Sequence, residues 1–152
     1  MAIKKASKNT ARKPERGSGL TAEEKAAMSE TLEDEKRKAK GAEGEALLLE
    51  KVAAMKEPDR SMAKKVHAIV KANAPTLTPT TWYGMPAYSK DGKAVLYFQD
   101  AAKFKARYAT LGFNDIATLD DGEMWPTSYA LKAVTPAIEA KIIALVKRAV
   151  RS

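Results

Sequence analysis

The sequence predicts an α+β domain of two layers: N-terminal helices, an antiparallel sheet of about four or five strands, and a C-terminal helix packed on the sheet. Changes in hydrophobic period predict this order. Apolar residues recur at helical spacing before residue 75, alternate with polar ones after residue 79, and return to helical spacing after residue 135. Helices, then strands, then a helix are typical of the α+β class.

The composition excludes several kinds of chemistry. The chain has 152 residues, no cysteine, one histidine and a formal net charge of +8. Cysteine nucleophiles, zinc fingers and iron–sulfur clusters are therefore excluded, and so are multi-histidine metal sites. The apolar runs are far shorter than the roughly 20 residues that cross a bilayer, and the N-terminus lacks a signal-peptide pattern. We expect a cytoplasmic protein with no membrane partner.

Residues 1–20 are the first of three expected segments. They carry six Lys and Arg residues against one Glu, with almost nothing apolar. Such a segment cannot offset the entropy lost on ordering, so we expect a disordered basic tail. Its charge favours weak, nonspecific contact with nucleic acid.

A charged helix is expected within residues 21–44. Thr21 lies three residues before Glu24, which is the spacing of a capping box. Opposite charges four residues apart support the helix, but Met28 and Leu32 are its only large apolar residues. We therefore expect a solvated extension that projects from the body. It could dock a partner or a second copy, although it is too polar for a coiled coil.

The folded body is expected over residues 45–152 and starts with two packed helices. The first has an apolar stripe that includes Leu48 and Val52. The sequence EPDRS then breaks the helix, and Asp59 is the expected N-cap of a second helix, which Pro75 ends.

Strands are expected in the middle of the body. The dipeptide Asp91–Gly92 lies between two strand-like runs and favours a two-residue type I′ turn, so it predicts a hairpin. Residues 105–111 and 124–131 alternate in polarity and predict two more strands, the second at a sheet edge or with a bulge because of Pro126. Residues 114–123, between them, predict a short helical turn and a loop.

The last expected element is an amphipathic helix that docks on the sheet. Thr135 is its expected N-cap, and Pro136 suits the first helical position. Ile138, Ile142 and Val146 then form an apolar stripe.

Residues 81–88 concentrate two tyrosines and a tryptophan around a glycine and a proline. Flat apolar side chains with polar edges are typical of small-ligand cavities, although the same residues could instead form the core at a bend. The first interpretation predicts a non-enzymatic pocket with a basic rim, which favours a small anionic ligand. Its predicted lining is Trp82, Tyr83, Gly84, Met85, Pro86, Tyr88, Lys103, Arg107, Tyr108, Trp125 and Ser128.

The string TWYGMPAY, followed by the Asp-Gly hairpin, AVLYF and a lysine-bearing loop, resembles the YdhG-like family. This is a domain of unknown function whose members are often described as frataxin-like iron chaperones. The resemblance covers about residues 45–150, and Tyr83–Pro86 is its most specific part. It implies a small intracellular α+β domain, a pocket lined by the YGMP segment, and iron as a candidate ligand. Lys105 and Asp121–Gly122 depart from the family pattern, which has a histidine and a Lys-Gly pair there.

Iron without histidine or thiolate ligands would need carboxylate oxygens. The dense acidic group of the body is the weak candidate, and its members are Asp115, Asp120, Asp121 and Glu123, with Asp100 as a further member. The alternative is a solvated acidic loop in which Asp and Gly serve turns. The positive charge of the body opposes cation accumulation.

A basic cluster gives the alternative function. Lys105 and Arg107 share one face if their segment is a strand, with Lys103 beside them and Tyr108 on the other face. Basic side chains interleaved with aromatic ones suit nucleic acid or phosphate-bearing ligands. No reaction class is predicted, because the lone His67 borders an apolar stripe and no nucleophile motif is present.

Overall fold

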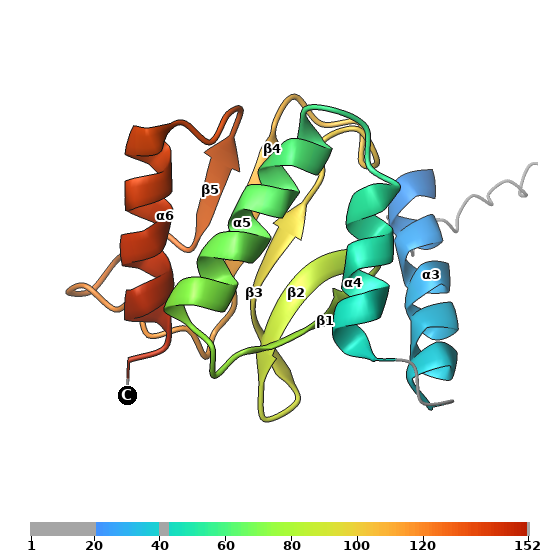
Figure 1. Cartoon of the computed structure of the whole chain (residues 1–152), viewed down its shortest axis with the longest axis horizontal. Coiled ribbons are helices and arrows are strands. Elements are labelled where there is room, and N and C mark those ends of the chain that lie inside the picture. The colour runs from blue at the N-terminus through green and yellow to red at the C-terminus, as the bar shows by residue number, and fades with distance from the viewer. Residues whose placement is uncertain (1–20, 40–42, 152) are drawn as a thin grey trace, which may run out of the picture.

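The structure is a computed structural model that describes residues 21–39 and 43–151, with side chains from residue 21 to 35 and from 43 onward. The predicted tail, residues 1–20, lies outside the described residues. Figure 1 shows helices followed by a sheet and a last helix, which confirms the predicted α+β class. None of the described helices combines the length and the apolar character needed to cross a membrane.

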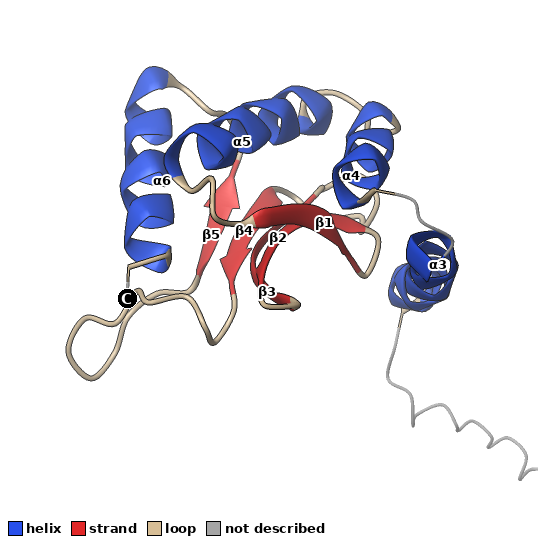
Figure 2. Cartoon of the chain, turned by 60° about the horizontal axis from the view of Figure 1, so that its bottom comes forward, coloured by secondary structure: helices blue, strands red, loops and turns tan. Residues whose placement is uncertain are grey.

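The helices and strands follow one another in the predicted order. Their bounds are α3 Ala22–Ala39, α4 Gly44–Ala53, α5 Asp59–Asn73, β1 Thr78–Trp82, β2 Met85–Lys90, β3 Lys93–Gln99, β4 Ala109–Phe113, β5 Ser128–Leu131 and α6 Pro136–Ala149. The five strands form one antiparallel sheet in the order β1-β2-β3-β4-β5. Figure 2 shows α4, α5 and α6 on one face of this sheet and α3 beside the β1 edge.

The strand register decides which side chains face the helices. Tyr88 pairs with Leu96 and Leu96 with Phe113, so these three share one face, and all are buried. Tyr97 pairs with Gly112 on the opposite face of the sheet, and α4, α5 and α6 do not cover that face. The core therefore lies between the first face and the helices. Its largest fully buried side chains include Tyr88, Phe98, Leu47, Leu48, Leu96, Leu111, Ile142 and Val146.

Several local predictions are confirmed. Asp91 and Gly92 have φ values of 51° and 78°, as a type I′ turn requires. The capping box is complete, because the Thr21 amide donates to Glu24 and the Glu24 amide donates to Thr21 Oγ1, both at 3.0 Å. Thr135 caps α6 through the Ile138 amide.

Three predictions about the body are wrong in detail. Asp59 is the first residue of α5 rather than its N-cap, and its buried carboxylate accepts a hydrogen bond from the Ala102 amide at 3.0 Å. The predicted strand over 105–111 begins only at Ala109, because the preceding loop closes on itself when the Ala106 amide donates to the Ala101 carbonyl. Residues 114–123 form turns and no helix. For Asp59 and for the loop before Ala109, a contact with a distant segment or within the loop overrides the local pattern.

Helix α3 is docked, which differs from the expected solvated extension. Met28 and Leu32 are 48% and 67% exposed, as a solvated helix would have them. Ala27 and Asp34 are nevertheless buried, and Asp34 is only 2% exposed. Gly44, the last residue of the expected extension, starts α4, where a Cβ atom would lie 2.6 Å from the Pro79 carbonyl oxygen.

Candidate functional site

The YGMP segment forms the tight turn between β1 and β2. Tyr83 and Gly84 have φ values of 52° and 76°, which places both in the left-handed region. A Cβ atom on Gly84 would lie 2.4 Å from Glu30 Oε1 and 2.7 Å from Lys103 Nζ. The glycine therefore serves both the turn and the close approach of two charged side chains.

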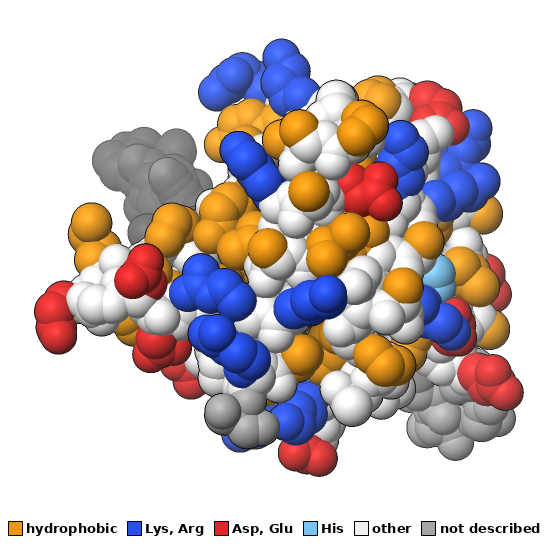
Figure 3. Space-filling view, turned by 60° about the vertical axis from the view of Figure 1, so that its left-hand side comes forward, with side chains coloured by type: hydrophobic (Ala, Val, Ile, Leu, Met, Phe, Trp, Pro, Cys, Tyr) orange, Lys and Arg blue, Asp and Glu red, His pale blue; other side chains and the backbone are white. Residues whose placement is uncertain are grey.

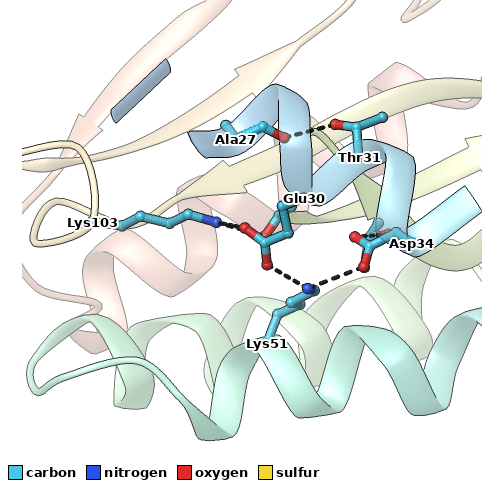
Figure 4. A network of polar contacts seen from close by, with 8 residues as sticks. Ala27, Glu30, Thr31, Asp34, Lys51 and Lys103 are labelled. Carbon is cyan, nitrogen blue, oxygen red and sulfur yellow. Dashed lines mark hydrogen bonds and ion pairs between the residues drawn. The ribbon is translucent and has the colours of Figure 1, made fainter. Parts of the chain in front are cut away.

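Glu30 of α3 is the centre of a network of ion pairs, shown in Figure 4. Its two carboxylate oxygens contact different ammonium groups, those of Lys51 on α4 and Lys103 in the β3–β4 loop. Lys51 also contacts Asp34 at 3.1 Å, and Asp34 accepts a hydrogen bond from the Thr81 hydroxyl at 3.1 Å. The network joins α3, α4, the sheet edge and the loop.

The residues of α3 that take part lie on one face. Glu23, Ala27, Glu30 and Asp34 follow one another at steps of four, three and four, which brings them to the same side of a helix. Glu23 contacts Lys105 at 2.8 Å. We call these four residues the acidic face of α3. Their spacing is visible in the sequence, but the charge pairs that the sequence predicts within the helix do not indicate that this face docks.

Two members of the network, Glu30 and Lys51, favour each other's charged forms. Burial alone would raise the pKa of Glu30, but Lys103 and Lys51 outweigh it and hold the pKa below its usual range. Burial alone would lower the pKa of Lys51, but Glu30 and Asp34 raise it. Because the folded pKa of Glu30 is depressed, the stability it contributes is present above its unfolded pKa of about 4.3 and is lost as pH falls through the folded pKa. Acid therefore weakens the docking of α3.

Two cavities flank this network, and α3 forms a wall of each. One, of about 320 Å³, is lined by residues that include Glu30, Lys51, Gly84 and Lys103. The other, also of about 320 Å³, is apolar, and its lining includes Ala27, Met28, Tyr83, Met85 and Phe104. Charged groups and apolar surface thus lie on the two sides of the Tyr83–Gly84 turn.

Two buried carboxylates border the loop that carries Lys103. Asp100 lines the charged cavity, and burial raises its pKa. Asp59 fixes the start of the loop through the Ala102 amide. Asp59 thus holds the backbone of the loop, and Glu30 holds the Lys103 side chain. The Lys103 Nζ atom also lies 3.4 Å from the Gly84 carbonyl oxygen.

Tyr88, one of the predicted pocket residues, lies buried in the core. It is 1% exposed, and its hydroxyl lies 2.9 Å from Nδ1 of His67, whose Nε2 lies 2.9 Å from Glu45. Burial raises the pKa of Tyr88. Glu45 also binds Lys71. Tyr88 is thus a core residue. Its hydroxyl has a hydrogen-bond partner in His67, which in turn contacts Glu45 near the surface. Pro86 is buried beside Tyr88.

The other predicted pocket residues are spread over separate places. Trp82 lines a cavity of about 410 Å³, and its ring centroid lies 4.8 Å from Tyr83 and 5.1 Å from Tyr97. Trp125 lines a fourth cavity, of about 520 Å³. The other three predicted residues do not line the cavities near Gly84. The Arg107 guanidinium lies 5.1 Å from the centre of the Tyr108 ring, and Ser128 is exposed on β5. The predicted residues do not form one pocket, because the turn at 83–84 and the β4–β5 loop lie at different parts of the sheet.

The predicted carboxylate ligands do not gather either. Asp115 and Asp120 line the site beside Trp125, whereas Asp121 and Glu123 are exposed around the turn at Gly122. Among the described residues, no three His, Cys, Asp or Glu side chains are placed to hold a metal ion. Figure 3, which brings the α6 side forward, shows Lys and Arg side chains spread over this face rather than gathered in one patch.

The chemistry of the site follows from its own residues, since comparisons of the chain with family models, curated proteins and solved structures find no match. Lys51 and Lys103 are largely buried, with side-chain exposures of 17% and 27%. Two ammonium groups that converge in a partly desolvated cleft favour an anionic oxygen group. Glu30 supplies that group within the chain.

Proposed function

We propose that this protein is a non-enzymatic binding domain that takes a small anionic ligand beside the Tyr83–Gly84 turn, where Lys51 and Lys103 converge. The observation that carries the proposal is the convergence of Lys51 and Lys103 on one carboxylate. Paired ammonium groups bind a carboxylate or phosphate with charge-assisted hydrogen bonds. Burial strengthens this attraction, because less water screens it.

The apolar cavity next to the lysines suggests the rest of the ligand. Tyr83, Met85 and Phe104 offer a flat surface there, which suits an aromatic or aliphatic body. A small amphipathic anion therefore fits better than a bare ion. This retains the predicted role of the YGMP segment with a smaller set of residues.

Iron, which the resemblance to YdhG-like proteins implies, has less support. The described residues hold no cluster of three or more metal-ligating side chains. The chain also carries a formal net charge of +8, which opposes the approach of cations. We therefore rank an anionic ligand above a metal.

Benzoate is a suitable probe, because it joins a carboxylate to a flat apolar body. We expect its titration, followed by amide chemical shifts in NMR spectra, to move the signals of Gly84 and Lys103. The variant Lys103→Met should weaken binding about tenfold or more, which corresponds to the loss of about 1.4 kcal/mol. Lys71→Met is the matched control, because Lys71 also pairs with a carboxylate but lies on α5. Equal affinity in the two variants, or no binding of benzoate and of inorganic phosphate, would refute the proposal.

A second candidate function is the binding of single-stranded nucleic acid. It is favoured by the ring cluster of Trp82, Tyr83 and Tyr97 at the sheet face that α4, α5 and α6 leave open. Bases stack on such rings at about 1–3 kcal/mol each. The predicted arrangement of Lys105 and Arg107 on a strand face does not contribute, because both precede β4.

Fluorescence anisotropy with an oligothymidine tests this candidate. If it holds, Trp82→Ala should weaken binding about tenfold at about 150 mM salt, and Trp82→Phe, which keeps a ring, should restore most of it. Binding that vanishes at that salt concentration and ignores Trp82 would leave only counterion attraction to the basic chain.

A further inference from the structure

We infer that α3 is a built-in competitor for the proposed anion site: the Glu30 carboxylate occupies the place of the ligand's anionic group, and ligand binding displaces the helix. The inference rests on the proposed function and states how that same site is regulated. It starts from the fact that both ammonium groups of the site are bound to Glu30.

The described contacts of α3 are largely ionic. Ala27 is the one apolar residue among its described side chains that is buried, whereas Met28 and Leu32 are 48% and 67% exposed. Burial of a single alanine contributes little to docking. Ion pairs with Lys51, Lys103 and Lys105 and a hydrogen bond from Thr81 to Asp34 also hold the described part of the helix. A ligand with a carboxylate or phosphate group can therefore bind the same lysines and replace the ion pairs that hold the helix.

The cavities explain why displacement creates a better site. Glu30 lines one cavity, and Ala27, one turn earlier on the same face, lines the other. When α3 leaves, the two cavities open together on either side of Gly84. Gly84 has no side chain, so the turn supplies no charged group in place of Glu30, although the Gly84 carbonyl oxygen stays near Lys103 Nζ. The opened cleft places two ammonium groups next to apolar surface, which is complementary to an amphipathic anion.

Displacement has a thermodynamic consequence that can be measured. A ligand that binds only the protein with α3 released has its affinity reduced by the fraction of molecules in that state. Weakening the docking of α3 must therefore tighten ligand binding, and the ligand must in turn release α3.

Affinity gives the first test. Glu30→Gln keeps the shape of the side chain but removes its charge, so we expect benzoate affinity to rise about fivefold or more. Glu33→Gln is the matched control, because it makes the same change at an exposed position of the same helix. Benzyl alcohol, which lacks the carboxylate, should show no such difference. Equal benzoate affinity in the two variants would overturn the inference.

Thiol labelling gives the second test, because the chain has no cysteine of its own. Ala27→Cys places a single thiol on the buried face of α3, and Ala63→Cys places one in the core on α5. At constant ionic strength, benzoate should speed the reaction of iodoacetamide at position 27 about fivefold or more and leave position 63 unchanged. Binding without faster labelling at position 27 overturns this inference alone. Absence of benzoate and phosphate binding, in wild type and Glu30→Gln alike, overturns the proposed function as well.

Discussion

Tyr88→Ala is expected to lower the free energy of unfolding by about 3–5 kcal/mol, which is the usual cost of truncating a buried aromatic side chain. Tyr88 is 1% exposed and belongs to the core cluster with Leu96 and Phe98. Its loss leaves a cavity and removes the hydrogen-bond partner of His67 Nδ1. Urea unfolding followed by circular dichroism measures the change.

Tyr83, in the same sequence motif, is the matched control. It is 41% exposed at the β1–β2 turn, so Tyr83→Ala should cost less than about 1 kcal/mol. Tyr88→Phe, which removes the hydroxyl alone, should fall between the two at about 1–3 kcal/mol. A similar cost for Tyr83→Ala and Tyr88→Ala would contradict the assignment of Tyr88 to the core.

Lys51→Met is expected to release α3 and to cost about 3 kcal/mol. Lys51 contacts both Glu30 and Asp34, and the Asp34 side chain is 3% exposed. Removal of one partner from a buried ion pair costs about 3–5 kcal/mol, and the lower end applies because α3 can leave and return its carboxylates to water. In the Ala27→Cys background, iodoacetamide labelling should become about tenfold faster or more.

Lys71→Met shows what the same substitution does at an exposed pair. Lys71 is half exposed and contacts Glu45, so its loss should cost less than about 1 kcal/mol and leave position 27 protected. High salt should imitate Lys51→Met in part, since screening weakens the more exposed pair of Glu23 with Lys105 first. If Lys51→Met were as stable as Lys71→Met and kept position 27 protected, ionic docking of α3 would be refuted.

Elements governed by neighbours in the chain could be predicted well. The Asp91–Gly92 turn, the Thr21 capping box and the Thr135 N-cap each depend on hydrogen bonds or φ angles within a few residues. The order of helices and strands follows from hydrophobic period for a similar reason, because burial on one face imposes it.

Predictions about single side chains were less successful. Asp59 has the position of an N-cap, but its carboxylate binds the Ala102 amide, which is distant in the sequence. The residues next to Tyr88 in the sequence are typical of a ligand pocket, but the register of β2 places the Tyr88 side chain against α5. Lys103 is among the predicted site residues, whereas its ion-pair partner Glu30 is not.

The sequence by itself determined the fold class, the hairpin and the caps, because those depend on backbone conformation and on local periodicity. Only the tertiary structure decided the candidate site. Glu30, Lys51, Gly84 and Lys103 come from four separate segments, and no spacing in the chain relates them. Charges so far apart in sequence meet only after the core has placed α3, α4 and the β1–β2 turn side by side. Their attraction then becomes strong, because the cleft that joins them is partly closed to water.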